Sequence, residues 1–212
     1  RVVKSYVQEK NMLQLFDANS LLYRDNALKL AKVDSLYYPS ILLLIGASTH
    51  AGEDEIILAA HRQLLETQPD ALLILVPRHP ERFNSVHELC ISEGLTTRRR
   101  STAEAVQTGD QVLLGDTMGE LLFLYALADI AFVGGSLVAN GGHNLLEPAA
   151  LGKPVLSGPH LFNFLEIAAQ LRQAGALSEV ENAVQLADRV ATLLNEPSEI
   201  QRMSQAGLSV LK

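Results

Sequence analysis

Cysteine and long hydrophobic runs are both scarce in this chain of 212 residues. Its one cysteine, Cys90, has no second thiol to pair with, so the chain is not a small secreted domain held together by disulfides, and we expect Cys90 to be a buried apolar residue. The longest apolar runs, residues 41–47 and 71–77, are of strand length and fall short of the roughly 18 residues that a transmembrane helix needs. No signal-peptide pattern follows Arg1. We therefore expect a soluble chain, cut from a longer protein.

Positive charge is in the minority. The chain has 17 Lys and Arg against 24 Asp and Glu, a formal net charge of -7. Affinity for a phosphate backbone depends on a surplus of Lys and Arg, so the composition excludes a general nucleic-acid binder. With 48% hydrophobic residues, a chain of this length buries about 70% of its unfolded surface and needs no metal or disulfide to fold.

From residue 41 onward, apolar segments of strand length alternate with amphipathic segments. Strands are predicted at residues 41–48, 71–77, 111–116, 129–135 and 153–158. Helices are predicted at residues 53–68, 80–94, 119–128, 143–152, 162–173, 182–195 and 198–212. Continuous apolar strands with helical crossovers predict an α/β fold with a doubly wound parallel sheet. Residues 41–212 should form this one domain, and residues 1–40 a poorly defined N-terminal segment or linker with a helix at 19–32.

A glycine-rich loop follows the fourth predicted strand, and ligands of such sheets bind beyond the carboxyl ends of the strands. Gly134, Gly135, Gly141 and Gly142 let the backbone take positive φ and let a ligand approach the main chain, and the helix that follows offers free amides to an anion. The loop therefore predicts a phosphate cradle, with a glycine-rich turn that binds nothing as the alternative. Neither GxGxxG after the first strand nor GxxxxGK[ST] is present, which excludes the usual dehydrogenase and P-loop sites.

The helix after the glycines carries two candidate side chains. Glu147 can accept hydrogen bonds from the two vicinal hydroxyls of a ribose, or it can simply favour the start of the helix. His143 lies four residues before it, a spacing compatible with a metal, but no third ligand suggests itself and we predict no metal site. His143 is instead expected to donate to an anion or to order the loop.

Two more strand ends carry polar residues. Arg78 and His79 lie between two prolines that stiffen the turn, where they can bind a phosphate or carboxylate, or remain exposed without a partner. Ser48 and Thr49 can contact a substrate or cap the next helix, whose first acidic residues, 53–55, are expected to serve the helix end.

The loop at residues 115–120 predicts contact with a flat base through Met118 and Gly119, although Met118 can also be a packing residue. Residues 98–100, three arginines, are expected to be solvated loop surface. No Ser-His-Asp, Cys-His or paired-carboxylate arrangement stands out, so no catalytic residue is predicted. The residues by themselves indicate a nucleotide-binding domain with one anion subsite.

Five motifs, in this order, resemble the C-terminal half of the 3-deoxy-D-manno-octulosonic acid (Kdo) transferases. They are STHAGE, ILVPRHPERF, LLGDTMGEL, FVGGSLVANGGHNLLEPAALGKPV and GPHLFNF, and the resemblance covers residues 41–212. Before them, NALKLAKVD is only faintly similar to the linker motif of the family.

The resemblance implies a GT-B glycosyltransferase, in which two Rossmann-like domains face each other across a cleft. The C-terminal one binds the nucleotide-sugar donor CMP-Kdo. The family transfers Kdo to a lipid A precursor in lipopolysaccharide biosynthesis, at the cytoplasmic face of the bacterial inner membrane, with inversion and without metal or cofactor. The acceptor domain, its membrane contact and the catalytic base would lie outside this chain, which alone would be inactive.

Under this resemblance each candidate residue receives a part of the donor. The phosphate is assigned to Gly134, Gly135 and Ser136 together with the helix that starts near Asn144. Arg78 and His79 would meet the phosphate or the sugar carboxylate, Glu147 the ribose, and Met118 with Gly119 the cytosine. Two alternatives stay open, the donor half of a UDP-sugar transferase or epimerase and a nucleotide-binding module without catalytic activity.

Overall fold

The computed structural model describes residues 42–211, so the helix predicted at residues 19–32 lies outside the described part. The strands are β1 (Leu43–Thr49), β2 (Leu72–Pro77), β3 (Thr97–Arg99), β4 (Val112–Leu114), β5 (Ile130–Val133), β6 (Val155–Ser157) and β7 (Leu177–Glu179). The helices are α2 (Asp54–Thr67), α3 (Phe83–Ser92), α4 (Leu121–Leu127), α5 (Leu146–Ala150), α6 (Leu165–Ala174), α7 (Ala183–Asn195) and α8 (Pro197–Val210), with short 3₁₀ turns η1 (Pro80–Arg82) and η2 (Arg100–Thr102).

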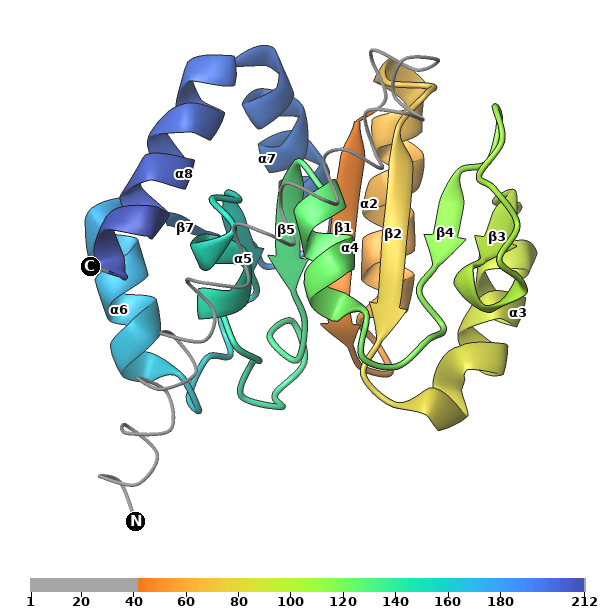
Figure 1. Ribbon diagram of the computed structural model, residues 1–212, viewed down its shortest axis with the longest axis horizontal. Coiled ribbons are helices and arrows are strands. Elements are labelled where there is room, and N and C mark those ends of the chain that lie inside the picture. The colour runs from red at the N-terminus through yellow and green to blue at the C-terminus, as the bar shows by residue number, and fades with distance from the viewer. Residues whose placement is uncertain (1–41, 212) are drawn as a thin grey trace. The chain divides into compact units, whose positions relative to one another are not determined.

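The seven strands form one sheet in the order β3-β4-β2-β1-β5-β6-β7, and every pair is parallel (Figure 1). The chain starts at β1, runs outward through β2 to β3 and β4, and returns to the other side of β1 as β5. The strand order therefore reverses between β1 and β5, which is where open α/β sheets bind ligands. The predicted doubly wound parallel sheet is confirmed.

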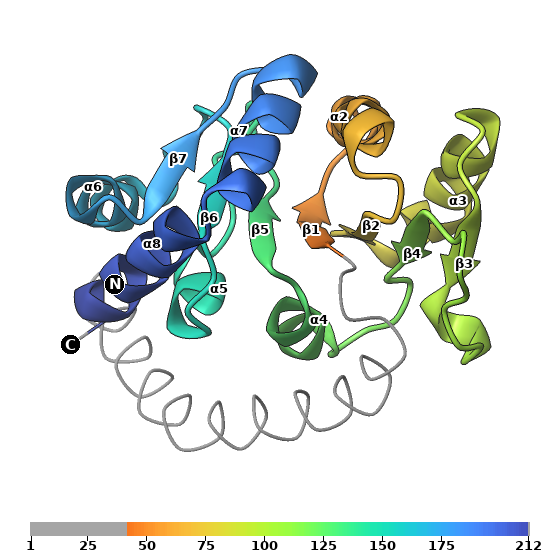
Figure 2. The same ribbon diagram turned by 90° about the horizontal axis from the view of Figure 1, so that it is seen from above.

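Helices cover both faces of the sheet. Seen from above, α2, α3 and α7 lie on one face and α4, α5 and α8 on the other (Figure 2). The α2 and α7 face buries Leu58 and Val190 in the same core cluster as Leu73 of β2. Strands covered in this way are apolar throughout, and for that reason the five inner strands β1, β2, β4, β5 and β6 were predictable. None of the helices in the described range is both long enough and apolar enough to span a bilayer.

Two helix ends follow from local sequence. Gly175 ends α6 with a φ of 75°, the left-handed conformation that glycine adopts without a Cβ clash. Asn182 begins α7, and its side chain accepts a hydrogen bond from the amide of Gln185. The helix predicted at residues 143–152 is shorter than expected, since α5 has only five residues.

Arg98 and Arg99 are not loop surface, because they belong to β3, an edge strand of the sheet, and Arg100 begins the 3₁₀ turn η2. Arg98 pairs with Asp110 at 2.7 Å, Arg99 with Asp116 at 2.6 Å, and Arg100 with Glu120 at 2.9 Å. A polar edge strand of three residues gives no apolar pattern, and charges on an edge also oppose pairing with another sheet.

Candidate functional site

The candidate site lies at the carboxyl ends of β1, β2 and β5. The pairing of β1 with β2 shifts register between Ala47 and Thr49, and Ser48 between them has a φ of 56°, a left-handed conformation that is uncommon outside glycine. A Cβ on Gly134 at the end of β5 would lie 2.8 Å from the carbonyl oxygen of Ser48. The bulge in β1 and the glycine of β5 therefore fit together at the point where the strand order reverses.

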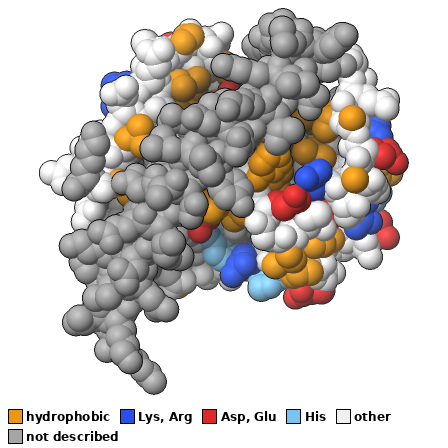
Figure 3. Space-filling view, viewed as in Figure 1, with side chains coloured by type: hydrophobic (Ala, Val, Ile, Leu, Met, Phe, Trp, Pro, Cys, Tyr) orange, Lys and Arg blue, Asp and Glu red, His pale blue; other side chains and the backbone are white. Residues whose placement is uncertain are grey.

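Three imidazoles lie close together here, beside one guanidinium that has no partner among the described residues. The Nε2 atoms of His50 and His143 are 2.8 Å apart, with the two rings stacked at 6° and their centroids 5.0 Å apart. The ring of His79 meets the ring of His50 edge-on at 5.4 Å. We call His50, His79, His143 and Arg78 the histidine–arginine cluster. Histidines and cationic side chains are visible at the strand-end edge of the molecule (Figure 3).

The histidine pair is held in its neutral form. Burial, reinforced by the nearby His50 and Arg78, lowers the pKa of His143 to about 4. Burial also lowers the pKa of His50, although Glu53 acts in the opposite direction. Because both rings are neutral at pH 7, one Nε2–H donates a hydrogen bond to the other Nε2 across the 2.8 Å contact.

Arg78 supplies the permanent positive charge of the cluster. Its side chain is exposed and makes no hydrogen bond or ion pair within residues 42–211. Its amide donates to the carbonyl of Thr49 at 3.0 Å, which fixes the start of the turn, and its charge acts on both His143 and Glu147. The structure therefore brings together four residues that the sequence predicted separately, namely Arg78, His79, His143 and Glu147.

The amides of Gly134, Gly135 and Ser136 in the glycine-rich loop are not free. The amide of Gly134 donates to the carbonyl of Ala47 at 2.8 Å, and the amides of Gly135 and Ser136 donate to the carboxylate of Glu53 at 2.7 and 2.9 Å. The prediction that these amides are open to a phosphate is therefore wrong in this structure, since a buried side chain of the protein already occupies them.

The glycines are needed instead for close packing of the loops. A Cβ on Gly135 would lie 2.9 Å from the ring of His143, and one on Gly141 would lie 2.2 Å from the side chain of Asn163. Gly142 has no room for a Cβ against Leu161. Positive φ at these three glycines and their lack of a Cβ allow the loop to fold back on itself. The space that a side chain would take is filled by neighbouring protein atoms.

The small hydroxyl residues also have structural partners. Thr49 is fully buried and its hydroxyl donates to Asp54 at 2.6 Å, and Ser136 is fully buried and its hydroxyl donates to the carbonyl of Val133 at 2.6 Å. Neither offers an exposed atom to a ligand, which corrects the prediction of direct contact. Ser48, at the bulge, is only 8% exposed, and its contact with a ligand stays a prediction.

Of the acidic residues 53–55, Glu53 and Asp54 have partners other than the helix end, and Glu55 lies exposed in the first turn of α2 as predicted. Asp54 is buried, bonded to Thr49 and ion-paired with Arg82. Glu53 is buried between the β1 and β5 loops. Its sequence context, an acid before an amphipathic helix, gave no sign of this role.

Glu147 and Asn144 sit together at the start of α5. The side chain of Asn144 accepts from the amide of Leu146 at 3.1 Å and donates to Glu147 at 3.1 Å. Burial raises the pKa of Glu147. The helix begins near Asn144 as predicted, and the assignment of Glu147 to a ribose stays a prediction.

Met118 and Gly119 lie in the loop after β4, away from these contacts. Met118 is 66% exposed, and Gly119 has a φ of 82° with no atom of another residue near the position of a Cβ. No hydrogen bond or ring contact joins this loop to the histidine–arginine cluster within the described range, so its role toward a base stays a prediction. Residues 42–211 contain no group of three His, Cys, Asp or Glu side chains that could hold a metal ion.

Comparison with known proteins gives matches over nearly the whole described range. Residues 42–210 match the family of glycosyl transferases group 1. A 3-deoxy-D-manno-octulosonic acid transferase of Haemophilus influenzae is 50% identical over 186 residues, which are 86% of this chain and 44% of that protein. The transferase of the same name from Bordetella pertussis is 43% identical over 168 residues, 76% of this chain and 38% of that protein. The chain thus spans less than half the length of these curated relatives.

One solved structure is similar over almost its full length. The crystal structure of the C-terminal CMP-Kdo binding domain of WaaA from Acinetobacter baumannii superposes with a TM-score of 0.85 at 37% identity. The match covers 91% of this chain and 99% of that domain.

Proposed function

Because the chain belongs to the glycosyl transferases group 1 family, and within it to the Kdo transferases, we propose that it is the half of such an enzyme that binds the donor CMP-Kdo. The observation that carries the proposal is the histidine–arginine cluster at the strand-order reversal. It places three imidazoles and one guanidinium, unpaired within residues 42–211, where α/β sheets bind their ligands, in a domain similar to one that binds CMP-Kdo.

The chemistry of the donor fits these side chains. Loss of CMP from the donor places negative charge on its phosphate, and a fixed cationic environment stabilises that charge more in the transition state than in the ground state. Arg78 provides the fixed charge and His50, His79 and His143 provide ring N–H donors. The amides of Gly135 and Ser136 bind Glu53 and are left out of this assignment.

We extend the proposal to the whole enzyme. It transfers Kdo to a lipid A precursor with inversion, at the cytoplasmic face of the inner membrane, and it requires no metal because side chains supply the positive charge at the leaving phosphate. Acceptor, membrane contact and catalytic base belong to the other half of the enzyme. This chain alone therefore binds donor without transferring Kdo.

Isothermal titration of the chain with CMP, CDP, UMP and UDP tests the donor assignment. CMP should bind at least about tenfold more tightly than UMP and UDP. Preference for UDP would favour a UDP-sugar transferase or epimerase, and absence of binding by all four nucleotides would contradict the proposed function.

A further inference from the structure

The carboxylate of Glu53 connects the two loops that carry the histidine pair. Its Oε2 accepts the amide of His50 at 3.0 Å and the amide of Gly135 at 2.7 Å. Its Oε1 accepts the amides of Ser136 at 2.9 Å and Leu137 at 2.8 Å. The side chain is fully buried, and all four of these partners are backbone N–H groups. Four charge-assisted bonds from two loops make a rigid connection.

The positions of both imidazoles of the pair depend on this connection. His50 is bonded to Glu53 through its own amide. Gly135 lies against the ring of His143, and the carbonyl of Gly135 accepts the amide of Gly142 at 2.7 Å, so the backbone just before His143 is tied to the same point. The 2.8 Å distance between the two Nε2 atoms therefore depends on where Glu53 holds the β1 and β5 loops.

We propose that Glu53 is a positioning residue of the donor site, which aligns His50 and His143 for the anion of the donor without touching it. The inference rests on the proposed function of the cluster. In this proposal the glycine-rich loop is not a phosphate cradle. Its amides bind the carboxylate of Glu53, which in turn positions the side chains of His50 and His143.

Glu53→Gln tests the proposal with little change of shape. The amide group of Gln has one oxygen and one NH₂, so in either orientation two backbone N–H donors face another donor and lose their partner. We expect the variant to fold with a lower Tm, to bind CMP at least about tenfold more weakly, and to lose the shared proton between the imidazoles. By NMR, the pKa of His143 should rise from about 4 toward the ordinary value of roughly 6.5 as the ring becomes exposed.

Glu55→Gln is the matched control. It makes the same chemical change two residues further on, at an exposed position in the first turn of α2. It should bind CMP within twofold of the wild type and leave the imidazole signals unchanged. A folded Glu53→Gln protein with wild-type CMP affinity and wild-type imidazole signals would overturn the proposal.

If Glu53→Gln does not fold, Glu53→Asp is the variant that tests the proposal. The charge remains, but the side chain is one methylene shorter and cannot reach both loops, so CMP affinity should fall about fivefold and the imidazole signals should move. Wild-type behaviour of this variant would also overturn the proposal. If the wild-type chain does not bind CMP, the proposed function fails, and the imidazole signals still show whether Glu53 aligns the histidine pair.

Discussion

Arg78 is the residue on which we expect affinity for the donor to depend most directly. Its guanidinium makes no hydrogen bond or ion pair within residues 42–211, so it needs no rearrangement to meet a phosphate. One charge-assisted hydrogen bond contributes about 1.5–3 kcal/mol, which corresponds to roughly tenfold to a hundredfold in affinity. Arg78→Ala should therefore weaken CMP binding at least about tenfold by isothermal titration. Arg62→Ala removes an exposed arginine of α2 that pairs with Glu93, and it should not weaken CMP binding. Wild-type affinity for CMP in Arg78→Ala would contradict the assignment.

Glu147 is predicted to distinguish ribose from deoxyribose. Its carboxylate lies beside Asn144 and within the field of Arg78, at the start of α5. An oxygen that accepts from the 2′-hydroxyl favours CMP over dCMP, and removal of that oxygen removes the difference. Glu147→Ala should reduce the ratio of the two affinities toward one. Glu166→Ala, an exposed acid in the first turn of α6, should leave the ratio unchanged, and a preserved ratio in Glu147→Ala would rule out this role.

His61 makes the stability of the domain depend on pH. Its side chain is fully buried, Nε2 bonds to the carbonyl of Gln111 at 2.8 Å, and Nδ1 has no hydrogen-bond partner among residues 42–211. Burial lowers the pKa of His61 to about 4, below the roughly 6.5 of the unfolded chain. Between these values the unfolded state binds a proton that the folded state does not, so stability is lost as pH falls from about 6.5 toward 4.

Urea unfolding at pH 7.5 and 5 measures this loss. His61 alone should lower the free energy of unfolding by about 2 kcal/mol over that interval, from a pKa shift worth about 1.4 kcal/mol per unit. His61→Gln should show a correspondingly weaker pH dependence. His87→Gln, which changes a partly exposed histidine of α3, should keep the wild-type slope. A wild-type slope in His61→Gln would contradict the prediction.

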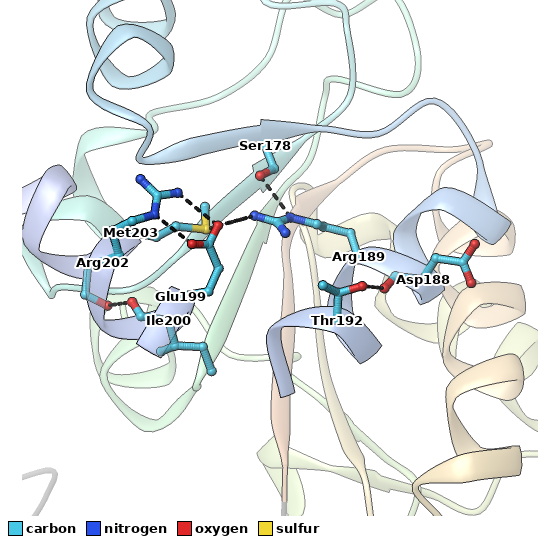
Figure 4. Close-up of polar contacts among 9 residues, drawn as sticks. Ser178, Asp188, Arg189, Thr192, Glu199, Ile200, Arg202 and Met203 are labelled. Carbon is cyan, nitrogen blue, oxygen red and sulfur yellow. Dashed lines mark hydrogen bonds and ion pairs between the residues drawn. The ribbon is translucent and has the colours of Figure 1, made fainter. Parts of the chain in front are cut away.

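At the scale of elements, one carboxylate joins α7 and α8. Glu199 accepts from Arg189 at 3.0 Å and from Arg202 at 2.7 Å, and Arg189 also donates to Ser178 of β7 at 3.1 Å (Figure 4). Arg202 and Arg189 lower the pKa of Glu199 to about 2. The network is partly exposed, so solvent screens it and each pair contributes about 1 kcal/mol or less.

Glu199→Gln should lower the Tm by a few degrees at pH 7. The ordinary pKa of a Glu is near 4.3 and that of Glu199 is depressed, so the stabilisation is present above pH 4.3 and is lost as pH falls toward 2. The variant and the wild type should therefore differ less at pH 2.5, if both remain folded there. Glu196→Gln, an exposed acid just before α8, is the control, and an equal loss of Tm in both variants would show that the network is not the cause.

Elements with a long apolar pattern could be predicted from the sequence, and short polar ones could not. β1 and β2 are buried along nearly their whole length because they lie in the centre of the sheet. Their apolar composition therefore indicates that they are central strands. β3 has three partly buried polar residues, and β7 has one buried residue of three. Edge strands of this length receive their conformation from the neighbouring strand, a tertiary effect that a local pattern does not contain.

The same division applies to the site. Arg78 directly follows β2 and His143 lies in the loop that follows β5, so their arrival at one edge was predictable from the order of the sheet. The role of Glu53 was not predictable, because three of its four partners are amides 82 to 84 residues further along the chain. A pattern of glycines also does not tell whether a ligand or the protein fills the space beside them.

At the scale of the whole molecule, the resemblance read from five motifs is confirmed by relatives that are about twice as long as this chain. The anion site that we propose lies in the described part, and the proposed function assigns the catalytic base to the other half of the enzyme. We therefore expect the chain to bind CMP but to give no Kdo transfer from CMP-Kdo to a lipid A precursor. Mixing it with the N-terminal half of a relative such as the Haemophilus influenzae transferase should restore turnover if the two halves associate.

The restored activity has two properties that follow from the site. Because the proposed function assigns the positive charge at the leaving phosphate to Arg78, addition of EDTA should leave the rate unchanged. Arg78→Ala in the reconstituted enzyme should lower kcat/KM by at least about tenfold, because the lost bond stabilises the transition state. Transfer measured by radiolabelled Kdo provides the readout. Turnover by the chain alone would place the base within this half, and strong inhibition by EDTA would mean that a metal, not the histidine–arginine cluster, carries the charge.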